Sequence, residues 1–376
     1  MLNRMNERLP RMLADLETLV RCESPSHDPD AVARSADVLA AVGAARLGAE
    51  PERLPHGCLR WRFGDGPARV LLLGHHDTVW PIGSLATHPV TVEGGVLRGP
   101  GCFDMKAGLV QAIHAVAELP DRTGITILVT GDEELGSPDS RELIEAEAAG
   151  CAAALVLEAS ADGGALKTER KGVSLYRVRA EGRAAHAGLE PERGVNASVE
   201  LAHQILAVRA LADAGEGTTV VPTRMTSGTT TNTVPAAGDF AVDVRIRTLG
   251  EQQRVDAAMR LLSPAVPGSR LIIEGGPNRP PLSKSQALYD QAVAVAGRLG
   301  LDAPGQASVG GASDGNFTAG VGTPTLDGLG AVGGGAHADH EHVVVAEMPR
   351  RAALVAALAA EILTPLRPVR AASPGW

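Results

Sequence analysis

The hydrophobic pattern of the first part of the chain predicts strands that alternate with helices. Apolar residues recur at helical spacing over residues 9–20. Short apolar or β-branched runs typical of buried strands follow at residues 69–73, 125–130 and 152–157. The segments between these runs that read as helices are 106–118 and 140–149. A strand–helix alternation of this kind predicts an α/β core with a mixed, largely parallel sheet.

The pattern changes after about Thr168. The segment SLYRVRAEG, which begins at Ser174, alternates apolar and polar residues as a half-exposed antiparallel strand does. The predicted elements that follow are a helix at 196–210, a strand at 239–247, a helix at 250–262 and a strand at 271–275. A β–α–β–β–α–β order, or one close to it, predicts a small α+β domain of the ferredoxin-like type.

The two patterns together predict an interrupted domain. GGPNRPPL at 275–282 reads as the linker that returns the chain to its first domain. The helix–strand–helix pattern that then runs to Leu366 would complete that domain, and the tail beyond is expected to fray. We therefore predict one α/β domain of residues 1–168 and 280–376, with an inserted α+β domain of residues 169–279.

Composition narrows the classes of function. The net charge of -9 argues against a sequence-independent nucleic-acid binder, which needs a basic face. No run approaches the roughly 20 apolar residues of a membrane span, and the N-terminus lacks a continuous apolar signal core. We therefore expect a cytoplasmic protein without a membrane or nucleic-acid partner. Its four scattered cysteines are expected to be reduced.

The most informative segment is LLLGHHDTV at 71–79, where a buried strand runs into polar residues. The carboxyl ends of parallel strands are where α/β sheets bind ligands. Extended geometry points His75 and Asp77 to one side and His76 to the other. His75 could bind a metal while Asp77 holds its second ring nitrogen. The alternative is an ordinary hydrogen-bonded histidine in a turn.

Two further segments place carboxylates after predicted strands or beside glycines. In GPGCFDMKAG at 99–108, Asp104 could cap the following helix or bridge two cations with its two oxygens. In VTGDEELGS at 129–137, three consecutive carboxylates would repel one another unless a positive charge compensates. Either this is a solvated acidic loop, or Glu133 is a general base and Glu134 a metal ligand.

The last two segments complete a candidate ligand set. Glu158 ends the predicted strand in LVLEAS, where a buried carboxylate needs a partner. The glycine-rich segment GGGAHADHEHVV at 333–344 adds His337, His340 and His342. Mixed nitrogen and oxygen ligands suit zinc, with cobalt or manganese as alternatives. We predict a site for two divalent ions that lowers the pKa of a bound water and polarises a carbonyl.

These five segments, in this order, resemble the metal and catalytic motifs of the M20 family of metallopeptidases. KGVSLYRVRAEGRAAHAGLEPERGVNAS likewise resembles the start of the family's lid or dimerisation domain. The resemblance implies a zinc-peptidase catalytic domain in which His75 binds metal and Asp77 orients it. It also implies that Asp104 bridges the two ions and that the peptide bond after it is cis. Glu133 would be the base, and the other ligands would be Glu134, Glu158 and His337.

The resemblance also assigns residues of the inserted domain. His186 in GRAAHAG would reach the active site of a partner subunit and stabilise the oxyanion, although alone it reads as a surface histidine in a turn. Asn232 would have a similar role, and Arg279 would bind a substrate carboxylate, for which an arginine fork is suited. Arg245 is either a second carboxylate binder or a structural ion-pair partner.

The function implied is that of a homodimeric, metal-dependent amidohydrolase. The glutamate carboxypeptidase branch is the most similar, which implies removal of a C-terminal amino acid such as glutamate from a small amide. The alternatives are an N-acyl-amino-acid deacylase of the acetylornithine deacetylase or aminoacylase type, and a non-catalytic family member.

Overall fold

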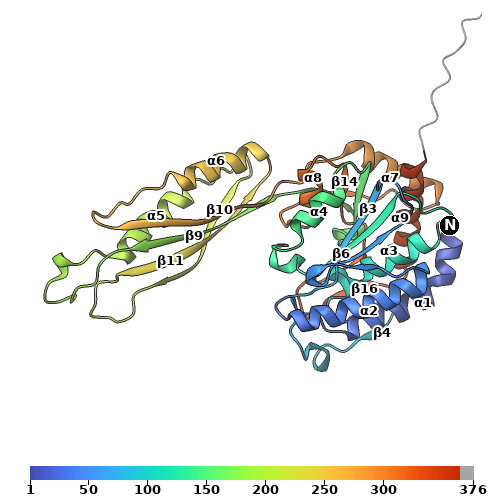
Figure 1. The fold of residues 1–376 in the computed structure, drawn as a ribbon, viewed down its shortest axis with the longest axis horizontal. Helices are drawn as coiled ribbons and strands as arrows, with labels where there is room; N and C mark the ends of the chain where they lie inside the picture. Colours follow the sequence, from blue (N-terminus) through green and yellow to red (C-terminus); the bar gives the residue numbers. More distant parts are fainter. Residues whose placement is uncertain (365–376) are drawn as a thin grey trace, which may run out of the picture. The chain divides into compact units, whose positions relative to one another are not determined.

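The computed structural model describes residues 1–364, and the chain divides into two compact units (Figure 1). The first unit contains Met1–Thr168, Lys284–Ala307 and the chain from Val321 on, and the second contains Glu169–Ser283 and Ser308–Gly320. The short segment Ser308–Gly320 thus lies with the second unit, whereas the sequence boundaries leave it in the first. Asn316 holds it there, because its amide donates to the carbonyl oxygens of Lys171 (3.1 Å) and Pro280 (2.7 Å).

The first unit is built on a six-stranded sheet with the order β1-β2-β6-β3-β7-β14. Its parallel strands are β6 (Ile125–Thr130), β3 (Val70–His75), β7 (Ala153–Val156) and β14 (Thr325–Leu326). The antiparallel edge consists of β2 (Leu59–Arg62) and β1 (Glu52–Arg53). Every residue of β3, β6 and β7 is buried, as expected for parallel strands that are covered on both faces. The predicted mixed, largely parallel sheet is therefore confirmed.

Helices from both ends of the chain bury this sheet. Helices α3 (Ala107–Ala117) and α9 (Glu347–Leu363) pack on each other and on β3 (Figure 1). Helix α1 (Leu2–Arg21) packs on α3 and α9, and α7 (Gln286–Arg298) packs on α9. Helix α4 (Arg141–Ala148) also belongs to this unit, and β8 (Leu166–Arg170) and β13 (Gln306–Val309) pair where the chain passes between the two units. Helix α8 (Gly315–Gly320) lies in the segment that belongs to the second unit.

Helix α2 (Pro29–Leu47) was not predicted from the sequence. It is rich in alanine and lacks a strong apolar stripe, so hydrophobic periodicity does not reveal it. Its start signal is clear in the structure, because the side chain of Asp28 accepts a hydrogen bond from the backbone of Ala31 (3.0 Å). Pro29 occupies the first helical position, where its fixed φ is favourable.

A small antiparallel sheet connects two distant loops of the first unit. Its order is β15-β16-β5-β4, with β15 (Gly333–Gly334), β16 (His342–Val344), β5 (Val96–Arg98) and β4 (Thr91–Glu93). The pairing of β16 with β5 brings the loop at 335–341 beside the turn at 99–104. These are the segments that carry His337 and Asp104.

The second unit is a four-stranded antiparallel sheet with the order β10-β11-β9-β12, covered on one face by two helices. Its elements in chain order are β9 (Gly172–Glu181), α5 (Ala197–Arg209), β10 (Thr219–Ser227), β11 (Ala237–Ile246), α6 (Leu249–Arg260) and β12 (Arg270–Arg279). This is the predicted β–α–β–β–α–β order. Alternate residues of β9 and β11, such as Val178 and Phe240, form the core with Leu201 of α5 and Val255 of α6.

Strand β12 continues farther than predicted. Residues 275–279, which the sequence assigned to a linker, pair with β9 up to the partners Arg279 and Val173. The sequence did not predict this continuation because two adjacent glycines, Gly275 and Gly276, usually indicate a turn or loop. In the structure they adopt positive φ angles of 84° and 157°. Backbone pairing does not need apolar side chains, so the ladder persists through them.

Two other predictions concern the chain as a whole. Among residues 1–364, no helix is long and apolar enough to cross a membrane. All four cysteines lie in this part of the chain and are free. The tail after Leu366, which was expected to fray, lies outside the described residues.

A buried ion cluster links the three helices at the N-terminal side of the first unit. Asp15 of α1 accepts two hydrogen bonds of 2.7 Å from Arg46 of α2 and one of 2.7 Å from His114 of α3. Burial alone would raise the pKa of Asp15, but the hydrogen bonds from Arg46 and His114 outweigh it and lower that pKa below its usual value. A lowered pKa means that the ionised carboxylate stabilises the fold above about pH 4, and that this stabilisation is lost as the pH falls through the lowered pKa.

We predict that Asp15→Asn lowers the free energy of unfolding by about 2 kcal/mol at pH 7. This is less than the loss for a fully buried pair, because Arg46 keeps access to water. The variant should also lose less stability than the wild type between pH 5 and pH 3. Urea unfolding at several pH values measures both effects. Asp37→Asn is the control, since the Arg53–Asp37 pair is exposed and should contribute under about 1 kcal/mol.

Candidate metal centre

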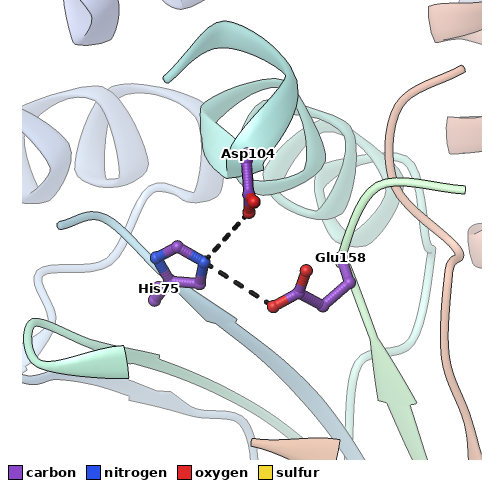
Figure 2. Close-up of side chains that lie close together, drawn as sticks. All are labelled: His75, Asp104 and Glu158. Atoms are coloured by element: carbon purple, nitrogen blue, oxygen red, sulfur yellow. Dashed lines mark ion pairs between the residues drawn. The ribbon is translucent and has the colours of Figure 1, made fainter. Parts of the chain in front are cut away.

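His75, the last residue of β3, is buried, and its two ring nitrogens face different groups. Its Nδ1 lies 3.0 Å from the backbone oxygen and 3.3 Å from Oδ1 of Asp77. Its Nε2 faces Oδ1 of Asp104 at 3.4 Å and Oε1 of Glu158 at 3.6 Å, and Figure 2 shows the three side chains pointing toward one another. This Nε2 has no hydrogen-bond partner among the described residues. A buried nitrogen beside two carboxylates fits a metal ligand.

Asp77 organises the strand ends around His75. Ser26 donates a hydrogen bond of 2.7 Å to its Oδ2, and the backbone N–H groups of Glu133 and Glu134 donate to its two oxygens at 3.3 and 3.2 Å. Burial would raise the pKa of Asp77, but its contacts with His75 lower it below the usual value. Asp77 therefore orients the histidine and also fixes the turn that begins after β6.

Asp104 divides its two oxygens between two histidines. Oδ1 faces His75, whereas Oδ2 lies 3.3 Å from Nε2 of His337. The same Nε2 of His337 is 3.1 Å from Oε1 of Glu134. Two groups of three candidate ligands result, namely His75–Asp104–Glu158 and Asp104–Glu134–His337, with Asp104 in both. A carboxylate shared in this way is the arrangement that two neighbouring cations require.

The structure also decides some of the local alternatives. The peptide bond between Asp104 and Met105 is cis, as predicted. Asp104 does not cap α3, because the capping position is Lys106 and no side chain bonds to the first turn there. His76 points away from His75 and contacts Ser35 (3.1 Å) and the carbonyl oxygen of Gly57 (2.9 Å). Burial lowers the pKa of His76 to about 4, so this histidine is neutral at pH 7.

The charge balance of the cluster favours cations. Asp104 and Glu134 raise the pKa of His337 to about 10. For His75, burial would lower the pKa, but the adjacent carboxylates of Asp104 and Asp77 raise it well above the usual value. The pKa of both histidines is therefore raised because the cluster contains more carboxylates than positive charges. Divalent ions would neutralise this excess of negative charge.

Glu133 occupies a different position from the ligand groups. It lies three residues after the end of β6, is buried, and belongs to neither group of three. Its backbone is tied to Asp77, and its charge acts on His75. Glu133 therefore lies next to the candidate ligands without being one of them.

Glu341 is a buried site residue that the sequence analysis missed. Its Oε1 accepts hydrogen bonds from the backbone N–H groups of Phe103 (2.8 Å) and Asp104 (3.0 Å). Its Oε2 accepts from the N–H of Gly101 (2.9 Å) and from the indole N–H of Trp80 (2.7 Å). Glu341 thus joins the loop that carries His337 to the turn that carries Asp104. In HADHEHV it lies among histidines, which were interpreted as candidate metal ligands. No feature of the segment indicates that Glu341 is buried.

The loop itself holds His337 in an uncommon backbone conformation. His337 has a φ of 62°, in the left-handed region that residues other than glycine rarely adopt. His340 and His342, the other histidines of the segment, belong to neither ligand group, and Nδ1 of His342 bonds instead to the backbone oxygen of His340 (3.0 Å). Only His337 of the three faces the carboxylates.

The residues assigned in the second unit fall in two places. His186 is exposed and pairs through its backbone with Thr233, while the N–H of Ala187 bonds to the carbonyl oxygen of Asn232 (2.9 Å). His186 and Asn232 therefore lie on adjacent segments. Neither could have been paired with the other from the sequence, because 45 residues separate them.

The two arginines of this unit that the sequence analysis assigned, Arg245 and Arg279, both contact carboxylates. Arg245 forms two hydrogen bonds with Asp243, of 2.7 and 2.8 Å, which is the ion-pair alternative considered for it. Arg279 is buried, donates to Oδ1 of Asp314 (3.1 Å) and lies 5.3 Å from the ring centroid of Phe317. Both contacts fix the guanidinium planes within this unit.

The fold and the paired ligand groups define a metal-dependent hydrolase with an inserted α+β domain. The model of peptidase family M20/M25/M40 matches residues 71–361, which include all five candidate ligands. The chain belongs to this family.

Individual relatives extend over most of the chain. Carboxypeptidase G2 of Pseudomonas sp. (strain RS-16) is 30% identical over 370 residues, covering 93% of this chain and 88% of the relative. Succinyl-diaminopimelate desuccinylase 2 of Shewanella loihica is 29% identical over 318 residues, covering 77% and 83%. Among solved structures, the YXEP protein of Bacillus subtilis, a dinuclear metal binding peptidase from the M20 family, has a TM-score of 0.65 at 14% identity, covering 95% of this chain and 99% of that chain.

We predict that Glu341→Gln weakens metal binding by about 10- to 100-fold, the usual range for residues that support metal ligands. The glutamine amide would present N–H groups to backbone N–H donors that now meet an oxygen. Isothermal titration of the metal-free protein with zinc measures the loss. Asp339→Asn in the same loop is the control, because Asp339 is exposed and its change should leave zinc affinity unaltered. Equal affinities for both variants would contradict the role of Glu341.

Proposed function

We propose that the protein is a di-metal hydrolase that cleaves an amide bond of a small carboxylate-bearing substrate, as a C-terminal glutamate-type carboxypeptidase. The observation that carries the proposal is the pair of ligand groups that share Asp104 beside the non-ligand Glu133. The relation to carboxypeptidase G2 over 93% of the chain supports the carboxypeptidase assignment.

In this proposal, His75, Asp104 and Glu158 hold one ion, and Asp104, Glu134 and His337 hold the other. The ions are zinc, with cobalt or manganese as alternatives. When bound, they would polarise the scissile carbonyl and lower the pKa of the attacking water. Glu133 accepts the proton of that water and delivers it to the leaving nitrogen, as a general base and then a general acid. Asp77 keeps His75 oriented throughout.

The inserted domain supplies the groups that recognise substrate. Arg279 would bind the substrate carboxylate, because a guanidinium matches a carboxylate with two parallel hydrogen bonds. Arg245 would have to leave its pair with Asp243 to bind the substrate as well. His186 and Asn232 would stabilise the oxyanion that forms on the scissile carbonyl. Their positions on adjacent segments support a joint role.

A second candidate function is an N-acyl-amino-acid deacylase. The observation that favours it is the relation to succinyl-diaminopimelate desuccinylase 2, which covers 77% of the chain. A non-catalytic member would be expected to lack a ligand or the base, whereas all of these residues are present here. A hydrolysis screen of dipeptides with C-terminal glutamate and of N-acyl amino acids, with each metal supplied, tests the carboxypeptidase against the deacylase.

We place the protein in the cytoplasm as a homodimer in which His186 of one chain serves the metals of the other. Edge strands of the second unit, β10 and β12, have unpaired backbone groups that a two-fold mate could satisfy. His186 is exposed, and none of the candidate metal ligands lies in the second unit, which carries it. Both observations support a role of His186 toward another chain.

We predict that Glu133→Gln lowers kcat by at least about 100-fold, the lower end for general-base catalysis, and leaves the metal content unchanged. Asp104→Ala should instead lose metal, because both ligand groups need its carboxylate. Elemental analysis and steady-state kinetics on an N-acyl-glutamate distinguish the two losses. Glu142→Gln, on the exposed face of α4, is the matched control. Metal loss in Glu133→Gln would assign Glu133 to the ligands instead.

We predict that mixing two inactive variants restores activity if His186 acts across a dimer. His186→Ala chains re-dimerised with Glu133→Gln chains would form heterodimers that hold one intact composite site each. The expected yield is about a quarter of the wild-type rate for random pairing, because half of the dimers would have one working site of two. Mass spectrometry confirms that heterodimers exist. A mixture that contains heterodimers yet remains inactive would show that His186 acts within its own chain.

A further inference from the structure

The first unit contains a cavity that lies apart from the candidate metal centre. Its volume is about 290 Å³, and none of the candidate metal ligands lines it. The walls come from the end of α7, the loop at 301–305, the start of α9 and the residues Gly164 and Val332. A cavity of this size is at the lower end of the range for small-molecule sites.

The wall of this cavity contains a buried arginine with donors to spare. Arg351 of α9 is only 4% exposed, and its Nη2 donates a hydrogen bond to the carbonyl oxygen of Gly164. No other described residue accepts a hydrogen bond from this guanidinium, which offers five N–H groups. Burial lowers the pKa of Arg351 to about 10, so the group stays charged at pH 7. A buried charge with one neutral acceptor is costly unless an anion joins it.

The acidic groups near the cavity are committed to a different arginine. Arg350 lies 3.3 Å from Glu347 and 3.9 Å from Asp302. Arg351 forms no ion pair with a carboxylate among the described residues, and the charge of Glu347 acts on it only from a longer distance. The guanidinium of Arg351 is therefore the charged group of the cavity wall that lacks an ion-pair partner among the described residues, and this favours a bound anion.

We propose that this cavity is a binding site for a small oxyanion, held through the guanidinium of Arg351. The fork of the guanidinium suits two oxygens of a sulfate, a phosphate or a carboxylate group. A free cation is excluded by the charge of Arg351, and an apolar ligand would leave its N–H groups unsatisfied. The site does not depend on the proposed hydrolase function, since it shares no residue with the metal centre.

The cavity wall is connected by backbone hydrogen bonds to two segments that lead to candidate ligands. The carbonyl oxygen of Val332, in the cavity wall, accepts from the N–H of Val344 (2.8 Å), and Ala331 accepts from Ser160 (2.9 Å). The first contact holds the ends of the loop that carries His337, and the second holds the chain just after Glu158. An occupant of the cavity would thus lie against Val332, at the base of the loop that carries His337, and next in sequence to Ala331, without contacting a candidate metal ligand.

Titration of the zinc-loaded protein with sulfate, and separately with acetate, at constant ionic strength tests the proposal. Isothermal calorimetry should show saturable binding of at least one of these anions to the wild type. Arg351→Gln should raise its Kd by at least about 10-fold, as expected for loss of a charge-assisted hydrogen bond. Any anion that binds at the metals contributes equally in both proteins, so the difference reports the cavity. Preference for sulfate or for acetate identifies the kind of oxyanion.

A second variant protects the test against misfolding of Arg351→Gln. Ala303 lines the cavity and is exposed, so Ala303→Glu should fold and place a carboxylate beside Arg351 that competes with the ligand. It should also raise the Kd by at least about 10-fold. Ala45→Glu, an exposed position of α2 outside the cavity, adds the same charge and should leave the Kd unchanged. Absence of saturable binding to the wild type, or an unchanged Kd in Ala303→Glu, would overturn the proposal.

Discussion

The arrangement of the first unit depends on one electrostatic constraint: several carboxylates are buried at the same edge of a sheet. Parallel strands bring their carboxyl ends together, so His75, the turn after β6 and Glu158 after β7 converge there. Carboxylates so close together repel one another in a medium of low dielectric constant. The cluster is tolerable because histidines, backbone N–H groups and, in a metal enzyme of this family, divalent ions compensate the charge.

The same constraint explains why the supporting contacts are mostly made by backbone N–H groups. Asp77 accepts from the chain of Glu133 and Glu134, and Glu341 accepts from the turn of Asp104. Backbone donors partly neutralise a carboxylate without adding a mobile side chain, so they fix position and charge at once. The loop of His337 and the turn of Asp104 come from distant parts of the sequence, and the β5–β16 pairing holds them in register.

Sequence reasoning predicted the elements whose signal is local. The apolar runs of β3, β6 and β7, and the polar residues at their ends, were visible in hydrophobicity alone. Helix α2 was invisible because alanine carries no periodic signal, and the end of β12 was concealed by two glycines. The role of Glu341 could not be predicted, because its carboxylate accepts hydrogen bonds from backbone N–H groups that lie more than 230 residues away in the sequence. Arg245 illustrates another limit of sequence reasoning. The sequence does not show whether an arginine pairs with a carboxylate of its own chain, as Arg245 does with Asp243, or is free to bind a substrate.

The packing of α9 against α1 has a consequence for how the protein is made. The first helix of the chain and the last described helix share one core, and α9 also covers α3 and β3. Contacts between residues so distant in sequence form late, because the intervening chain must be ordered first. The second unit, apart from one short segment, is continuous and can fold as soon as it leaves the ribosome. During synthesis, the hydrophobic surface that α9 covers in the first unit therefore stays exposed until α9 itself has emerged.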